Sequence, residues 1–308
     1  MKCLFVYNPN SGNGRINKYL SYVVNRLSKR FDQIDCHPTK NPQDATKIAR
    51  EACGVYDYLI FAGGDGTFNE VIQGISGEDK RPILGYLPTG TTNDIAKTLG
   101  ISRNIKKAVD IILEGNTIQH DICRANECYF AYVAAAGTFT SISYTTKQKA
   151  KKALGKLAYF ISGIKDALKP YRLDLKITLD DHKVVEGNYA MILVMNSKSV
   201  AGFLFNKMTK LNDGIIDVVL IENAKKGIKS KLISTLSRII KLFTLGLYNA
   251  TKDRYVKHYQ ASKVKIEVSD KFDWCLDGEK GTSGPLNIQV LKEHIQIFAK
   301  KDKIQHYN

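Results

Sequence analysis

The stretch GGDGTFNE, residues 63–70, places three glycines around one aspartate directly after the apolar run YDYLIF, residues 56–61. The apolar run predicts a buried strand, and apolar residues then recur at helical spacing from Phe68 to Ile75. Glycines let the backbone approach a phosphate closely, and a helix start offers unpaired N–H groups and a partial positive charge. The stretch therefore predicts a phosphate-binding turn, although a tight turn without a ligand explains it equally well on its own.

Two further turns have the same character. YNPNSGNG occupies residues 7–14 and LPTGTTNDIA occupies residues 87–96, each after an apolar run. The carboxyl ends of parallel strands lie side by side, so the Gly, Ser, Thr and Asn donors of all three turns should meet in one crevice. The chain has no Walker A sequence, so a phosphate would have to be bound by these turns instead.

Segments with the pattern of a strand alternate with segments with the pattern of a helix over residues 2–100. This alternation predicts that the turns are positioned by a parallel sheet with helices on both faces. From residue 121 the signals are mostly those of strands separated by turns, which predicts a second, largely antiparallel β domain. We therefore expect domains at residues 1–122 and 123–290, with residues 291–308 packing back on the first.

Two basic helical stretches interrupt the predicted β domain. One covers residues 227–249 and carries apolar residues at spacings of three and four from Ile228 to Leu247, with lysines and an arginine between them. The other covers residues 147–169 and is crowded with lysines at its start. Such helices either pack on the core with a solvated charged face or dock on anionic lipid headgroups.

The composition sets limits on the partners. The formal charge of +16, from 46 Lys+Arg and 30 Asp+Glu, favours an anionic partner such as a nucleotide, a nucleic acid or an acidic membrane surface. The six cysteines form no C-x-x-C pair and the six histidines do not cluster, which argues against a zinc site. No run has the apolar character of a membrane span or a signal peptide, so we expect a cytoplasmic protein with peripheral membrane contact.

In combination, the motifs resemble those of the soluble diacylglycerol kinase family of bacterial lipid kinases, of the Gram-positive type. The ordered set is GGDGTFNEV, PTGTTND, HDI with Asp121, NDGIIDV at residues 212–218 and DGE at residues 277–279. The resemblance extends from Asn8 to Glu279. It implies an ATP-binding α/β domain similar to NAD kinase and phosphofructokinase, followed by a β-sandwich domain for the lipid substrate.

The resemblance also implies roles for individual residues. Asp65, Asp94 and Asp121 match the aspartates that organise Mg²⁺ and ATP, and Glu279 matches the general base. Taken singly, Asp94 could instead cap a helix and Asp121 could end a strand. The residues implied to contact the nucleotide are Asn8, Pro9, Asn10, Ser11, Gly12, Thr39, Gly64, Asp65, Gly66, Thr67, Phe68, Asn69, Glu70 and Thr91.

A second, structural Mg²⁺ is implied at the carboxylate of Asp213 and the main-chain carbonyls of Lys210 and Ile215. The family commonly has an acidic residue before this aspartate, and the chain has Asn212 there. An amide oxygen can still bind a metal-bound water.

The expected activity is transfer of phosphate from ATP to the primary hydroxyl of 1,2-diacylglycerol in an anionic membrane, giving phosphatidic acid. Other lipid acceptors (phosphatidylglycerol, a sphingoid base or a prenol) or a soluble acceptor such as NAD are alternatives. A basic protein that only binds nucleic acid or membrane is a further one, but no nucleic-acid-binding motif supports it. A homodimer is plausible by resemblance alone, and the inner face of the membrane is the expected location.

Overall fold

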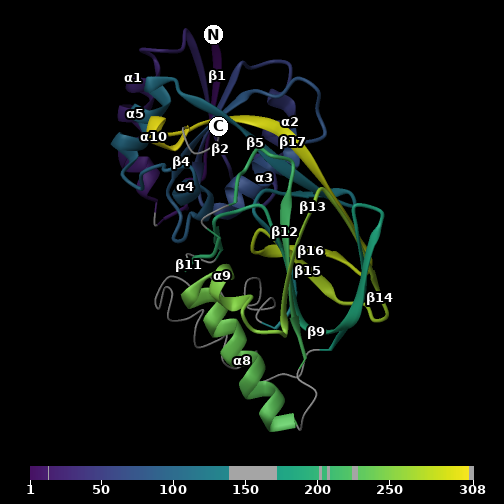
Figure 1. The fold of residues 1–308 in the computed structure, drawn as a ribbon. Coiled ribbons are helices and arrows are strands. Elements are labelled where there is room, and N and C mark those ends of the chain that lie inside the picture. Colours follow the sequence, from purple (N-terminus) through teal and green to yellow (C-terminus); the bar gives the residue numbers. More distant parts are fainter. Residues whose placement is uncertain (13, 139–171, 201–202, 207–208, 224–227, 305–308) are drawn as a thin grey trace. The chain divides into compact units, whose positions relative to one another are not determined.

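The computed structural model describes residues 1–12, 14–138, 172–200, 203–206, 209–223 and 228–304. The chain divides into two compact units (Figure 1). Unit 1 comprises Met1–Ile122, Lys210–Asp213 and Leu291–Asn308, and unit 2 comprises Cys123–Thr209 and Gly214–Val290. The basic stretch at residues 147–169 lies outside the described residues. None of the described helices is both long and apolar enough to cross a membrane.

The sheet of unit 1 is parallel, as the alternating strand and helix signals predict. Its strands lie in the order β2-β1-β3-β4, followed by the last part of β17. The central strands are apolar along their whole length because helices cover both faces. The bounds are β1 (Lys2–Tyr7), β2 (Gln33–Pro38), β3 (Tyr58–Gly63), β4 (Ile83–Pro88) and β17 (Leu286–Phe298).

The helices of unit 1 form two groups. The chain steps from β1 to β2 in one direction and then back across β1 to β3, so right-handed connections place α1 and α2 on opposite faces. Figure 1 shows α1 beside α5, and α2 beside α3. The bounds are η1 (Arg15–Tyr19), α1 (Leu20–Leu27), α2 (Asp44–Ala52), α3 (Asp65–Ile75), α4 (Asp94–Thr98), α5 (Ile105–Glu114) and α10 (Lys301–Ile304).

Unit 2 is an antiparallel β-sandwich, as predicted. Residues 183–189 of β9 pair with β8, and the second half of β9 pairs with β7 on one side and β12 on the other. The inward side chains of both layers form one apolar core that includes Tyr189, Val194 and Trp274. The bounds are β5 (Thr117–Ala125), β6 (Cys128–Phe130), β7 (Val133–Gly137), β8 (Leu173–Leu179), β9 (Lys183–Met195), β10 (Ser199–Val200), β11 (Phe203–Leu204), β12 (Ile216–Glu222), α8 (Ile228–Leu245), α9 (Leu247–Ala250), β13 (Val256–Ala261), β14 (Lys263–Val268), β15 (Asp273–Leu276) and β16 (Glu279–Ser283).

Four elements differ from the sequence-based expectation. The single strand β17 covers two runs, PLNIQVL and IQIFAK, that the sequence predicts as separate strands, and Glu293, at φ 51°, marks an irregularity between them. The predicted helix over 227–249 is divided at Gly246, whose φ of 78° ends α8. The helix α5 and the strand β13 were not predicted.

Candidate functional site

The strand order of the parallel sheet reverses at β1. The chain leaves β1 toward β2 on one side, and β3 lies on the other side of β1. In open α/β sheets a ligand binds outside the carboxyl ends of the strands at such a reversal. The turns that follow β1, β3 and β4 are the three glycine-rich turns of the sequence, so the topology brings them to one edge of the sheet.

The turn after β1 is packed against the end of β4. Gly12 has a φ of 57°, and a Cβ atom there would lie 2.0 Å from the carbonyl oxygen of Thr89, so only glycine fits. The hydroxyl of Thr89 donates to the Ser11 hydroxyl oxygen over 3.0 Å. Closer to β1, the Asn8 side-chain oxygen accepts a hydrogen bond from the Asn10 N–H at 2.9 Å, which shapes the turn itself.

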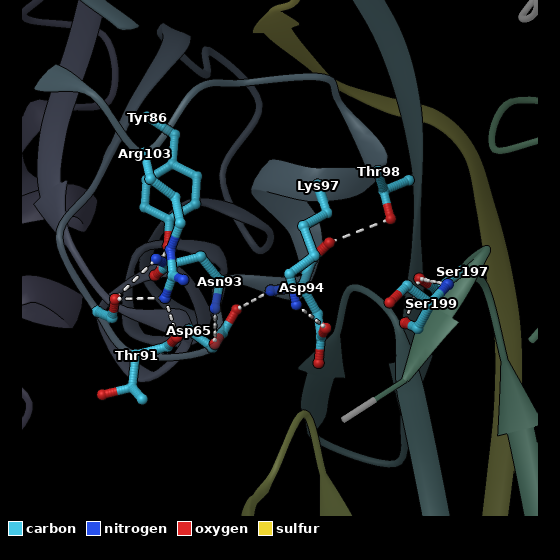
Figure 2. Close-up of polar contacts among 11 residues, drawn as sticks. Asp65, Tyr86, Thr91, Asn93, Asp94, Lys97, Thr98, Arg103, Ser197 and Ser199 are labelled. Carbon is cyan, nitrogen blue, oxygen red and sulfur yellow. Dashed lines mark hydrogen bonds and ion pairs between the residues drawn. The ribbon is translucent and has the colours of Figure 1, made fainter. Parts of the chain in front are cut away.

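The turn after β3 is joined to the turn after β4 through Asp65, the first residue of α3. One carboxylate oxygen accepts from the N–H of Asn93 at 2.7 Å, and the other accepts from the N–H of Asp94 at 2.8 Å (Figure 2). Gly64 and Gly90 make this approach possible, because a Cβ on Gly90 would lie 2.5 Å from the Gly64 Cα. The two turns are therefore held in one arrangement by the Asp65 carboxylate.

Side chains that the sequence did not single out stabilise the third turn. Asn93 adopts a φ of 51°; its side-chain oxygen accepts from the Tyr86 hydroxyl at 3.1 Å, and its amide nitrogen donates to the Gly90 carbonyl at 2.8 Å. Arg103 donates to the carbonyls of Gly90 and Thr91 (Figure 2). The Asn-Asp pair that starts α4 was the only local signal for this support, since asparagine tolerates the left-handed region.

Two carboxylates lie close together at this edge. Burial, and then the charge of Asp94, raise the pKa of Asp65 to about 6, against the lowering effects of the two N–H groups and Lys97. Asp94 is buried, and the Lys97 ammonium donates to it over 3.2 Å. An acidic pair of this kind can attract a divalent cation through oxygen ligands. Among the described residues, no group of three or more His, Cys, Asp or Glu side chains is arranged to hold a metal.

The start of α3 provides donors for an anion. Its N-cap residue, Gly64, has no side chain that could accept hydrogen bonds from the first N–H groups of the helix. These N–H groups lie at the edge of the sheet where the three turns meet. The combination of a glycine turn and an uncapped helix start is suited to phosphate.

Other residues implied to contact the nucleotide have structural partners. Phe68 is 1% exposed and its ring packs against those of Phe61 and Tyr86, so its side chain belongs to the core. The Glu70 carboxylate accepts from the N–H of Ala45 at 3.2 Å, at the start of α2. Thr39 is also buried, and its N–H donates to the carbonyl of Tyr7 at the end of β1.

The members of this predicted set differ in their exposure. Besides the buried Phe68 and Thr39, some are accessible, some are partly covered, and two more are buried on α3. Asn10, Gly12 and Thr91 are exposed; Asn8, Pro9, Ser11, Gly64, Asp65, Gly66 and Glu70 are half-buried; Thr67 and Asn69 are buried.

Asp121 lies deep in unit 1, away from solvent. Its N–H donates to the Leu211 carbonyl at 2.7 Å, and its carboxylate accepts from the N–H of Glu293 at 2.6 Å. The neighbouring His120 is fully buried with Nδ1 3.2 Å from the same carbonyl oxygen, and burial lowers the pKa of its ring to about 4. Asp121 thus joins β5, the segment Lys210–Asp213 and β17, three parts of the chain that are distant in sequence.

The residues implied to hold a structural metal lie on either side of Leu211 in the sequence. The side chains of Lys210, Asp213 and Ile215 are exposed, and they lie on either side of Gly214, which has a φ of 81°. The Leu211 carbonyl already accepts from Asp121, so it is a poor candidate for a metal ligand. An exposed carboxylate flanked by main-chain carbonyls at a glycine bend is a donor set that a hard cation accepts.

The turn between β15 and β16 carries Glu279 in unit 2. Glu279 is exposed, whereas Asp277 is 2% exposed and accepts hydrogen bonds from the N–H groups of Ala131, Tyr132 and Val133 at 2.7, 2.9 and 3.0 Å. Asp277 and Gly278 both have positive φ angles, of 51° and 87°. Asp277 therefore fixes the turn that presents Glu279, a role that the sequence did not reveal.

Comparisons with known proteins cover both units. The family model of the diacylglycerol kinase catalytic domain matches residues 2–125, and that of the YegS C-terminal NAD kinase beta sandwich-like domain matches residues 133–299. A crystal structure of a diacylglycerol kinase from Bacillus anthracis has a TM-score of 0.79 at 27% identity and covers 98% of each chain. An NAD kinase from Archaeoglobus fulgidus shares the fold alone, with a TM-score of 0.50 at 13% identity, covering 99% of this chain and 96% of its own.

Curated relatives match the chain nearly from end to end. The diacylglycerol kinase of Bacillus subtilis is 34% identical over 308 residues, which is 97% of both chains. The diacylglycerol kinase of Staphylococcus saprophyticus is 35% identical over 301 residues, which is 96% of this chain and 95% of the relative. With both domain models matched in order and relatives of this identity over its length, the chain belongs to the diacylglycerol kinase family.

Proposed function

We propose that the protein transfers the γ-phosphate of ATP to the primary hydroxyl of 1,2-diacylglycerol, giving phosphatidic acid and ADP. Its family identifies it as a kinase that acts on a lipid. The observation that carries the finer proposal is the meeting of three glycine-rich turns around Asp65. Phosphoryl transfer depends mainly on positioning and on neutralising charge, and this edge of the sheet would serve both.

Unit 1 would bind the nucleotide. The uncapped start of α3 would donate N–H groups to the phosphates, and Gly12, Gly64 and Gly90 would let the phosphates approach the backbone. The hydrogen bonds from Asn93 and Asp94 to Asp65 keep this edge in place before the nucleotide binds. Such preorganisation means that little rearrangement is needed as negative charge shifts during transfer.

Mg²⁺ would lie with the carboxylates of Asp65 and Asp94, which are hard oxygen ligands beside the phosphate donors. When bound, Mg²⁺ would neutralise charge on the transferred phosphate. A second, structural Mg²⁺ would be held by the Asp213 carboxylate and the carbonyls of Lys210 and Ile215. Asn212 would bind only through water, as an uncharged ligand.

Glu279 would act as the general base. Its exposed carboxylate would accept the proton of the acceptor hydroxyl as that oxygen forms its bond to the γ-phosphorus. The bond from the γ-phosphorus to the bridging oxygen would break at the same time, leaving ADP. Asp277 would orient Glu279, because its carboxylate holds the turn through three backbone N–H groups.

The test is transfer of labelled γ-phosphate from Mg-ATP to diacylglycerol in mixed micelles of anionic detergent. Phosphatidylglycerol, sphingosine, a prenol and NAD serve as competing acceptors. Glu279→Gln should lower kcat by at least about a hundredfold, because a general base contributes roughly that much. Glu127→Gln removes an equally exposed carboxylate of unit 2 and should leave kcat unchanged.

The outcomes separate the acceptor from the mechanism. Labelled phosphatidic acid that disappears in the Glu279 variant and persists in the Glu127 variant supports the proposal. Transfer to another lipid alone would keep the mechanism and replace the acceptor. An active Glu279→Gln variant would remove the general-base assignment.

A further inference from the structure

Arg238, on α8, has a buried guanidinium group with donors left over. The side chain is 91% buried, its Nε donates to the Asp253 carboxylate over 3.0 Å, and its Cζ lies 4.2 Å from the centroid of the Tyr255 ring. Its Nη1 is buried and has no hydrogen-bond partner among the described residues. A buried charged donor without a partner is costly, so this geometry points to a ligand that is not part of the chain.

A pocket of about 260 Å³ lies beside Arg238, between α8, α9 and the start of β13. Its charged lining residues are Arg238, Lys241, Lys252 and Asp253, three cations against one carboxylate, which gives a net charge of +2. Asp253 is already engaged, because one oxygen accepts from Arg238 and the other from the N–H of Tyr255. The pocket is therefore suited to an anion.

The residue types favour phosphate as that anion. An arginine presents planar N–H groups that match phosphate oxygens, and a lysine adds a point charge. Asn249 lines the same pocket and accepts from the Lys252 ammonium over 3.2 Å, which holds this cation at the rim. The volume exceeds that of one phosphate group, so the pocket also leaves room for the group to which the phosphate is bonded.

Exposed apolar side chains lie on α8 and α9, the two helices that carry most of the pocket lining. Leu245 is 57% exposed and lies one helical turn after Lys241, while Tyr248 is 79% exposed and lies with its ring centroid 4.9 Å from the Lys252 ammonium. Ile240 is a third, at 41% exposed. Cations at the level of headgroup phosphates, with Leu and Tyr side chains next to them, are the pattern of a helix that lies on a membrane surface.

We propose that this pocket binds the phosphate of an anionic phospholipid headgroup and so docks unit 2 on the membrane through α8 and α9. The choice of a lipid over a soluble phosphate rests on the proposed function and on the exposed apolar side chains of α8 and α9. The site is separate from the residues proposed for phosphate transfer, because it lies on α8, α9 and the start of β13.

The experiment compares two double variants of the full chain that lose the same charge. Lys241→Gln/Lys252→Gln removes the exposed cations of the pocket, and Lys183→Gln/Lys271→Gln removes two exposed lysines of unit 2 that do not line it. Binding is measured by co-sedimentation with vesicles of phosphatidylcholine alone and of phosphatidylcholine with an equal part of phosphatidylglycerol. Transfer is measured with dioctanoylglycerol in micelles of neutral detergent.

The pocket variant should bind the phosphatidylglycerol vesicles at least about tenfold more weakly than the unmodified chain, while the control variant should retain most of the binding. Equal losses in both variants would show that the overall positive charge is responsible for vesicle binding. That result would overturn the proposal that the pocket binds the lipid. Transfer to dioctanoylglycerol should be unchanged in both. If the unmodified chain shows no such transfer, the proposed function is contradicted instead. The vesicle measurement would still decide whether the pocket binds the lipid headgroup.

Two further measurements identify the occupant. Tyr248→Ser should weaken binding to the same vesicles without changing the sedimentation coefficient of the free protein. A variant that instead turns a dimer into a monomer would show that a second copy covers this face, which would overturn the proposal. The second measurement is the Tm in the presence of glycerol phosphate. If glycerol phosphate raises the Tm of the unmodified chain but not of the pocket variant, and both bind vesicles equally, the pocket binds a soluble phosphate compound. That result would overturn its membrane role.

Discussion

Unit 1 and unit 2 each use an Asp-Gly turn to hold distant backbone in place, but they leave different carboxylates accessible. Asp65 accepts from two backbone N–H groups and remains half-buried beside Asp94. Asp277 accepts from three and is 2% exposed. The same dipeptide therefore gives one aspartate that supports the turn and stays partly accessible, and another that supports a turn and is buried.

The difference shows how the chemistry is divided. In unit 1 the supporting carboxylate is itself the proposed metal ligand, with its pKa raised to about 6 by burial and by Asp94. In unit 2 the supporting carboxylate fixes the turn, and the proposed base is Glu279, two residues later. The motif alone could not distinguish these cases, because the number of backbone donors around each aspartate comes from tertiary structure.

The largest expected effect is at Asp65. Asp65→Asn keeps the size of the side chain but removes its charge, so kcat should fall by about a thousandfold. Asp44→Asn is the matched control, because Asp44 also accepts from two backbone N–H groups, those of Lys40 and Asn41, and has no proposed role. Steady-state kinetics of both variants, with circular dichroism to check folding, decide the point. Equal losses in both would mean that Asp65 acts only as a support.

The next effect concerns Asp277. Asp277→Ala leaves three backbone N–H groups without their acceptor, so the free energy of unfolding should fall by about 3 kcal/mol or more. Asp273→Ala removes a surface aspartate of the adjoining strand, and its effect should stay below about 1 kcal/mol. Urea denaturation measures both. If the Asp277 variant instead kept its stability and lost transfer, Asp277 itself would take part in the chemistry. The two turns would then not differ in the way described above.

A smaller effect concerns pH. Proposed metal binding needs ionised Asp65, whose pKa is about 6, so kcat/KM should fall about tenfold for each pH unit below that value. Asp94→Asn removes the negative neighbour and lowers the pKa of Asp65. The acidic limb of the plot of kcat/KM against pH should then move to lower pH, whatever the change in maximal rate. A limb that stays in place would show that another group titrates.

The smallest effect concerns the contact between two turns of unit 1. Thr89→Val keeps the shape of the side chain but removes its hydrogen bond to Ser11. One such bond contributes about 1 kcal/mol, so the KM for ATP should rise by about fivefold with little change in kcat. Thr178→Val in unit 2 is the control. An unchanged KM would mean that Gly12 alone sets the position of the first turn.

The fold was predictable where its signals are local. Apolar runs followed by glycine turns predict β3, α3 and β4, and the change of pattern after residue 121 predicts the sandwich. The helix α5 was missed although its signals are local: the Asn104 side chain accepts from Lys106 and Lys107, and Gly115 ends the helix. In β13 polar residues predominate between Val256 and Ala261, so no alternation marks the strand.

The supports of the candidate site were less predictable because their partners are distant in sequence. Ala131, one donor to the Asp277 carboxylate, comes 146 residues earlier. Asp121 depends on Leu211 and on Glu293, which come from two other parts of the chain. Even Asn93, close to Asp94 in sequence, owes its conformation to Tyr86 and to the turn that starts at Gly90.

The folding of unit 1 also depends on the order in which the ribosome synthesises the parts of the chain. Its sheet includes the last part of β17, where Ile297 pairs with Leu84, and Asp121 needs the N–H of Glu293. Domains usually fold during synthesis in the order in which they emerge. Here the first unit to emerge remains incomplete until the last strand is made, after all of unit 2. A nascent chain therefore carries an unfinished unit 1 through most of translation, and a C-terminal truncation would damage the N-terminal unit.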